Sequence, residues 1–215
     1  MKSFVVIGCG RFGASLAKTL YKLGNEVMVI DRSEDRIAEI SNSVTHAVEA
    51  DIMDENLLFD LGLSNFDVAV VAIGSVMEAS IMATLAAKEL GIKQVIAKAQ
   101  SDMHSRILLK IGADKVVFPE QDMGARVAHN LNSKNILDFI DFSPEYGIVE
   151  FVAFKEWENK SLRELSIPSK YHVTIIAIKR EERFILPPKS EEVVLKGDIL
   201  VAIGRSKDVE KLERI

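Results

Sequence analysis

A glycine pattern directly after the first apolar segment constrains this chain more than any other feature. Gly8, Gly10 and Gly13 follow the run SFVVI with the spacing G-x-G-x-x-G, and Asp31 ends the next apolar run. The first glycine permits a tight turn, the second lets a pyrophosphate approach the backbone, and the third lets a helix pack closely on a sheet. The pattern therefore predicts a βαβ unit that binds phosphates at a helix N-terminus.

The first part of the chain alternates short β-branched runs with helical segments, which is typical of a parallel sheet covered on both faces. Strands are expected at 3–8, 26–31, 44–50, 67–73, 94–99 and 115–120. Between the first two, Leu16, Leu20 and Leu23 recur at helical spacing, and Gly24 follows as a left-handed C-cap. Since parallel strands need right-handed crossovers, we predict an α/β fold with a doubly wound, six-stranded parallel sheet of Rossmann type.

The pattern changes in the remainder of the chain. Strands separated by turns are expected at 147–154, 172–180, 191–195 and 198–204, with helical pieces at 161–165 and 206–215. We therefore predict two domains, a nucleotide-binding domain at 1–134 and a small α+β domain at 135–215. The segment NILDFIDFSPEY at 135–146 is expected to join them.

The composition argues against two classes of protein. The formal charge of -5 is spread over both halves, so neither half is a basic nucleic-acid-binding module. The longest strongly apolar run, VAVVAI at 68–73, is far shorter than the ~20 residues that span a bilayer. No charged and then apolar leader pattern begins the chain. We therefore expect a cytoplasmic protein that binds no nucleic acid.

Cysteine and histidine residues give no sign of a metal site or a catalytic nucleophile. Cys9 is the one cysteine, and its place inside the glycine motif favours a packing role over a reactive one. His46, His104, His129 and His172 show no metal-ligand spacing, so we expect them to be structural or surface residues.

Four charged side chains are candidates for contacts to an adenosine compound. Asp31 can accept hydrogen bonds from both ribose hydroxyls, and its charge disfavours the 2′-phosphate of NADP. Arg11 could make a bidentate contact to a terminal phosphate or be a solvated surface residue. Arg32 could stack on adenine or meet a phosphate. Asp51 could accept a hydrogen bond from the adenine amine or cap a helix that begins near Asp54.

Two functions are compatible with these features, a nucleotide-sensing regulatory module and a small NAD-dependent oxidoreductase. A dehydrogenase needs a substrate pocket with an acid or base and an anion clamp, usually on a substantial second domain. The second domain here is small, and its charged residues form no constellation that we can connect to a reaction. Consumption of NADH with a second reactant would distinguish the oxidoreductase from the regulatory module.

Several longer segments together resemble one known family. They are FVVIGCGRFGASLAKTL at 4–20, EADIMDENLL at 49–58, VIAKAQSDMHSRILLKIGADKVVFPEQDMGARVA at 95–128 and VTIIAIKREERFILPPKSEEVVLKGDILVAIG at 173–204. Over essentially its whole length the chain is similar to the regulatory subunits of the Ktr and Trk potassium uptake systems, which are RCK or KTN proteins. The pairing of GADKVVFPE with the later GDILVAIG is more specific than the glycine motif.

The resemblance implies a gating protein rather than an enzyme. Its Rossmann domains (RCK-N) would bind ATP, ADP or NAD(H), pair, and assemble as a homo-oligomeric ring. The ring would lie on the inner face of the cell membrane beneath a potassium transporter subunit, and its shape would set the transporter's activity. In some members the C-terminal domain (RCK-C) binds cyclic di-AMP across a dimer. No residues here are specific enough to assign that ligand, so it stays open.

The resemblance also assigns residues to a nucleotide site. The phosphate loop would consist of Gly8, Gly10, Phe12 and Gly13, with Arg11 at the terminal phosphate. Around the adenosine the implied contacts are Asp31 at the ribose, Arg32 and Asp51 beside the adenine, Ile73 and Gly74 below it, and Lys98 facing the cleft.

Two positions leave alternatives open. Glu120 resembles an acidic position near the phosphates at the dimer interface, where it would coordinate a divalent or sodium ion. The sequence alone favours the alternative, a first-turn glutamate that complements a helix dipole. Family members often have Gly-Asp after the third strand, whereas this chain has Ala50-Asp51, which leaves the turn geometry there open.

Overall fold

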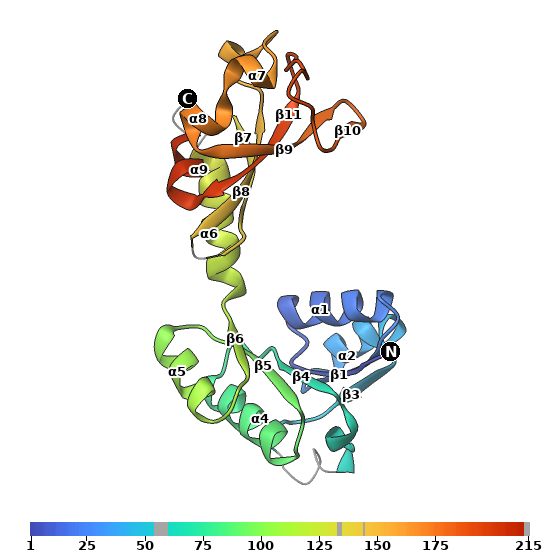
Figure 1. Cartoon of the computed structure of the whole chain (residues 1–215). Coiled ribbons are helices and arrows are strands. Elements are labelled where there is room, and N and C mark those ends of the chain that lie inside the picture. The colour runs from blue at the N-terminus through green and yellow to red at the C-terminus, as the bar shows by residue number, and fades with distance from the viewer. Residues whose placement is uncertain (54–59, 133–134, 144, 213–215) are drawn as a thin grey trace. The chain divides into compact units, whose positions relative to one another are not determined.

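The computed structural model describes residues 1–53, 60–132, 135–143 and 145–212. The chain divides into two compact units, Met1–Pro119 and Glu120–Ile215 (Figure 1). Helix α6 (Pro119–Asn132) therefore belongs by its contacts to the second unit. Its residue His129 stacks on Phe139, with ring centroids 4.6 Å apart. The domain boundary expected between residues 134 and 135 stays a prediction.

The first unit is built on a parallel sheet. Its strands are β1 (Ser3–Ile7), β2 (Glu26–Asp31), β3 (His46–Glu49), β4 (Val68–Val71), β5 (Gln94–Lys98) and β6 (Lys115–Val117). They pair in the order β3-β2-β1-β4-β5-β6, and each pairing is parallel. The chain runs outward from β1 to β3 and returns to β4 beside β1, which creates a topological switch point between β1 and β4. The predicted six-stranded Rossmann-type sheet is confirmed.

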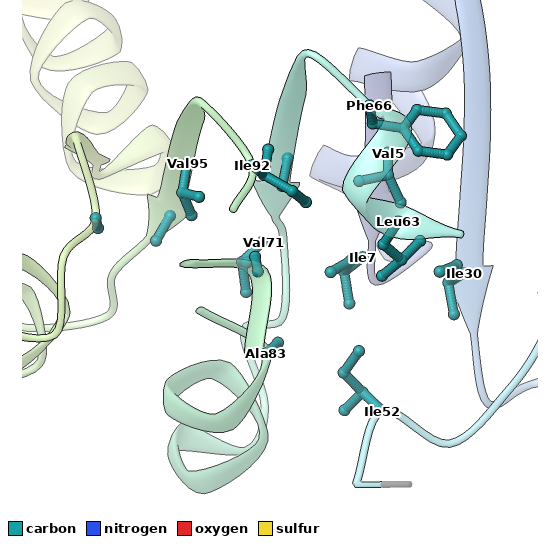
Figure 2. Close-up of a cluster of buried hydrophobic side chains, with 14 of the residues drawn as sticks. Val5, Ile7, Ile30, Ile52, Leu63, Phe66, Val71, Ala83, Ile92 and Val95 are labelled. Atoms are coloured by element: carbon teal, nitrogen blue, oxygen red, sulfur yellow. The ribbon is translucent and has the colours of Figure 1, made fainter. Parts of the chain in front are cut away.

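Helices cover both faces of this sheet, because its strands are apolar on both sides. The helices are α1 (Arg11–Lys22), α2 (Glu34–Ile40), α4 (Met77–Glu89) and α5 (Asp102–Lys110). Val6 of β1 belongs to one apolar cluster with Ala17 of α1, whereas its neighbour Val5 belongs to the opposite cluster with Ala83 of α4 and Leu108 of α5. Figure 2 shows this second cluster, in which side chains from β1, β2, β4 and β5 gather above Ala83.

The crossovers through α1, α4 and α5 turn at Gly24, Gly91 and Gly112, as the sequence predicts for Gly24. Gly24 after α1 and Gly91 after α4 have φ angles of +81° and +78°, in the left-handed region that favours glycine. The N–H of Gly24 donates to the carbonyl of Tyr21 at 2.9 Å, and that of Gly91 donates to the carbonyl of Lys88 at 3.0 Å. These turns return the chain to β2 and β5, whose carboxyl ends contribute to the candidate site.

The second unit is an antiparallel sheet with short helices, which confirms the small α+β domain. Its strands are β7 (Ile136–Asp141), β8 (Tyr146–Val152), β9 (Val173–Arg180), β10 (Arg183–Ile185) and β11 (Ile199–Arg205), in the order β10-β9-β11-β8-β7. Helices α7 (Leu162–Leu165), α8 (Ile167–Tyr171) and α9 (Ser206–Leu212) accompany it. The core includes Trp157, which meets Phe151 and Phe154 edge-on.

Two sequence expectations for this unit are wrong. The segment 135–146 is not a plain connection, because β7 forms within it and pairs with β8. The segment 191–195 is not a strand, because only Val193 makes an isolated bridge, to Ser161. The backbone groups of Glu192 and Val194 bond to the backbone of the turn at 159–162 instead of a regular ladder, and a side chain bonds the carbonyl between them. Arg180 Nη2 donates to the Val193 carbonyl at 2.8 Å, and Nη1 donates to Glu192 at 3.0 Å.

No helix in the described part of the chain is both long enough and apolar enough to cross a bilayer.

Candidate nucleotide-binding site

The glycine motif packs the loop between β1 and α1 tightly against the end of β4. Gly8 has a φ of +102°, and a Cβ placed on it would lie 3.1 Å from the backbone N and from Cγ1 of Ile73. A Cβ on Gly13 would lie 2.0 Å from the carbonyl oxygen of Gly8. No side chain fits in that space, so Gly8 and Gly13 have the turn and packing roles that the motif predicts.

Gly10 differs from its two partners because, beyond its chain neighbours, no atom of the described residues lies within 4 Å of a Cβ placed on it. It is the N-cap of α1, with φ -72° and ψ -176°, a conformation open to most residues. The backbone fold therefore does not explain a glycine here. A bare backbone at the positive end of a 12-residue helix leaves room for a phosphate group to approach the N–H donors.

Asp31 lies at the end of β2, and its carboxylate is bonded to the glycine loop. It is 8% exposed. Oδ2 accepts a hydrogen bond from the backbone N–H of Cys9 at 2.6 Å, and Oδ1 accepts one from Ser33 N–H at 3.0 Å. A carboxylate has about four acceptor positions, so these bonds leave capacity for ribose hydroxyls. Burial and the nearby charge of Asp31 raise the pKa of the Cys9 thiol, which favours its packing role.

Three further predicted residues lie close together, namely Gly74 after β4, Lys98 at the end of β5 and Phe12 of α1. A Cβ on Gly74 would lie 3.2 Å from Lys98 Nζ, and that ammonium lies 5.9 Å from the ring centroid of Phe12. Lys98 is 9% exposed. A cation is thus held at the carboxyl edge of the sheet next to the switch point, where open α/β sheets bind their ligands.

The remaining predicted residues of the first unit lie at its surface. Arg11, Arg32 and Asp51 are exposed. Asp51 Oδ1 accepts a hydrogen bond from Met53 N–H at 3.0 Å, which forms a local turn after β3. The helix that Asp51 was expected to cap, near Asp54, lies outside the described residues.

Glu120 lies in the first turn of α6, in the second unit. Within the described ranges, no three His, Cys, Asp or Glu side chains are grouped closely enough to hold a metal ion. The ion at Glu120, which the resemblance places at a dimer interface, stays a prediction.

Two features of this region were not predicted from the sequence. Arg36 of α2 pairs with Asp31, with Nη1 3.5 Å from Oδ2. In the sequence, this contact is signalled only by the position of Arg36 in the helix that follows β2. His104 is fully buried, and its Nδ1 accepts the N–H of Gln100 at 3.4 Å. Burial lowers the pKa of His104, which keeps the ring neutral and fits the structural role expected for it.

Comparison with known proteins decides the family. A family model of the TrkA-N domain matches residues 4–119, and one of the TrkA-C domain matches residues 148–215. The Ktr system potassium uptake protein C of Bacillus subtilis is 46% identical over 213 residues, which cover 99% of this chain and 96% of that protein. The chain belongs to the Ktr family of potassium uptake proteins. The resemblance read from the sequence is thereby confirmed.

Solved structures agree with the fold of this Ktr-family chain. The RCK domain of GsuK aligns with 99% of the chain at a TM-score of 0.68 and 17% identity, and the chain spans 47% of that protein. The crystal structure of GsuK bound to ADP aligns with 60% of the chain at a TM-score of 0.51 and 26% identity, covering 33% of that protein. The two-unit RCK architecture is therefore shared.

Proposed function

We propose that this chain is the nucleotide-sensing regulatory subunit of a membrane potassium transporter. The observation that carries this proposal is the 46% identity to a Ktr system potassium uptake protein over nearly the full length of both chains. A shared domain alone would say little about function, but a match that includes both units in order makes a shared role the simplest interpretation.

The ligand is an adenine nucleotide, ATP, ADP or NAD(H), bound at the carboxyl edge of the first sheet. The open space at Gly10, the buried acceptor Asp31 and the ammonium of Lys98 support this assignment. The neighbour solved with ADP supports it as well. The site residues are Gly8, Gly10, Phe12 and Gly13 at the phosphates, Arg11 at the terminal phosphate, Asp31 at the ribose, Arg32 and Asp51 at the adenine, and Ile73, Gly74 and Lys98 around them.

The nucleotide acts as an effector and not as a substrate. Binding shifts the protein between shapes only if the ligand binds these shapes unequally. The shape is that of a homo-oligomeric ring on the cytoplasmic face of the membrane, where it contacts the transporter subunit. The family favours this role over the small oxidoreductase that the sequence also allowed.

Functional complementation tests the regulatory role. The chain is expressed in Bacillus subtilis cells that lack their Ktr protein C and other potassium uptake systems, and growth is measured at limiting potassium. We expect the chain to restore growth and the Asp31→Ala variant to fail. Absence of rescue by a well-expressed chain that co-purifies with the membrane subunit would count against the proposal.

A second measurement separates effector from substrate. Light scattering with ATP, ADP, NADH or cyclic di-AMP reports assembly, and cyclic di-AMP is included because the C-terminal domain is its site in some relatives. NADH absorbance is followed in parallel with candidate second reactants. We expect nucleotide-dependent assembly without NADH consumption, whereas steady turnover of NADH would support the oxidoreductase.

A further inference from the structure

The ribose end of the candidate site contains a second charged group beside Asp31. Arg36 lies in α2, and its Nη1 donates to Asp31 Oδ2 at 3.5 Å. The Arg36 side chain is 56% exposed, and Asp31 is its only ion-pair partner among the residues described. A guanidinium has five N–H donors in a fixed fork, so most of those of Arg36 remain available to a ligand.

The negative charge of Asp31 is offset by its surroundings. Its two oxygens already accept N–H groups from Cys9 and Ser33, and Arg36 adds a full positive charge on the same carboxylate. Arg32, the next residue along the chain, is exposed and adds a second cation to the segment after β2. The repulsion that a bare aspartate exerts on a 2′-phosphate is therefore weakened here.

We propose that Arg36 determines specificity at the ribose, and that the site accepts adenosine compounds with a 2′-phosphate, such as NADPH, alongside those with a free ribose. This inference rests on the proposed nucleotide-binding function. A 2′-phosphate lies beside the carboxylate that binds the ribose, and a guanidinium next to that carboxylate can bind the phosphate through two parallel hydrogen bonds. It revises the expectation, drawn from Asp31 alone, that NADP is disfavoured.

NADH and NADPH provide the test, because they differ only in the 2′-phosphate and both can be followed by their fluorescence. For the full-length wild-type chain we expect dissociation constants within about threefold of each other, since one added phosphate contact offsets the residual repulsion by Asp31. Arg36→Gln should weaken NADPH binding by about tenfold or more and change NADH binding by less than about threefold. Arg36→Lys, which keeps the charge and loses the fork, should fall between them.

Arg106→Gln is the matched control. Arg106 is an exposed arginine on α5, and among the described residues its guanidinium hydrogen-bonds to the thioether of Met103 alone, at 3.5 Å. Its replacement should leave both dissociation constants unchanged. A second readout needs no variant, because an additional phosphate contact should make NADPH binding to the wild type more sensitive to salt than NADH binding.

Three results would overturn the inference. They are NADH binding without NADPH binding by the wild type, unchanged NADPH binding by Arg36→Gln, and equal weakening of both ligands by that variant. If the wild-type chain binds neither dinucleotide nor ADP, the proposed nucleotide-binding function itself is wrong. Failure of the inference and failure of the proposed function therefore give different results.

Discussion

The backbone N–H of Cys9 donates to the carboxylate of Asp31 at 2.6 Å, which connects the glycine loop to the end of β2. The same carboxylate is the predicted ribose acceptor. A ligand that changes the bonding of Asp31 would therefore also act on the loop at which we propose that its phosphates bind. This shared contact gives the site a direct means to couple nucleotide binding to the shape of its own backbone.

Replacement of Asp31 should reduce both binding and stability. Asp31→Asn keeps the shape but loses the charge, and we expect ADP affinity to fall by about tenfold or more, because charge-assisted hydrogen bonds are lost. The loss of the charged acceptor for Cys9 N–H should lower the free energy of unfolding by about 1–3 kcal/mol. Calorimetry and urea denaturation measure the two effects. Asp35→Asn, which changes an exposed acidic residue in the first turn of α2, is the control, and equal behaviour of the two variants would remove Asp31 from the site.

Gly13 and Gly124 should respond in opposite ways to alanine. The new Cβ of Gly13→Ala would meet the carbonyl oxygen of Gly8 at 2.0 Å, so α1 must move away from the sheet, at a cost of about 2–3 kcal/mol. Gly124 lies in α6, and outside its own helix backbone no atom of the described chain lies within 4 Å of its Cβ position, so Gly124→Ala should stabilise by about 0.5–1 kcal/mol. Thermal unfolding compares the two, and a harmless Gly13→Ala would show that the loop is looser than described.

Arg11 should bind the terminal phosphate of ATP. Arg11 is exposed at the start of α1 and is free to form a bidentate contact. For Arg11→Ala we expect the ratio of ATP to ADP affinity to change, with ADP affinity nearly retained. Calorimetric titration with both ligands is the measurement. An equal loss for ATP and ADP would assign Arg11 to a phosphate that both ligands share.

The Arg180–Asp198 pair should make the second unit sensitive to acid. Asp198 is 1% exposed, and burial alone would raise its pKa, but hydrogen bonds from Arg180 and from Leu195 N–H outweigh burial and hold the pKa below its usual range. The folded pKa is depressed, so the stabilisation is present above the unfolded value of about 3.9 and is lost as pH falls through the folded pKa.

Removal of one partner of this pair tests that assignment. Asp198→Ala leaves Arg180 without its buried partner, and we expect a loss of about 2–4 kcal/mol near neutral pH. The difference from the wild type should shrink as the pH approaches the folded pKa of Asp198. Urea denaturation over a pH series measures it, and a difference that does not change with pH would mean that the carboxylate charge contributes little.

The fold of the first unit could be predicted because its signals are local and repeated. Buried parallel strands appear as short apolar runs, and crossovers end at Gly24 and Gly91, so strand number, direction and covering helices follow from the sequence. The fold of the second unit is harder to predict from the sequence. Strand β7 was missed because the register shifts between Ile136 and Asp138, which breaks the alternation that indicates a strand.

The false strand at 191–195 and the missed Arg36 have a common cause. Apolar β-branched residues at 193–194 look like a strand, but Arg180 of β9 bonds the carbonyl of the first, and the turn at 159–160 bonds the backbone groups of the second. Tertiary contacts of this kind leave no local pattern. Arg36 meets Asp31 through the packing of α2 against β2. In contrast, the glycine loop, Lys98 and Phe12 could be placed at one edge of the sheet because parallel strands all end there.

Calorimetric titration of ADP into the wild-type chain and the Gly10→Ala variant is the most direct measurement of nucleotide binding at this loop. In the part of the chain that the structure describes, the new methyl group meets no atom within 4 Å beyond its chain neighbours, so thermal unfolding of the variant should match that of the wild type. Because the methyl group occupies the space through which a phosphate approaches the start of α1, we expect ADP to bind the wild type and not the variant. Equal ADP binding by the two folded proteins would contradict a phosphate site at Gly10.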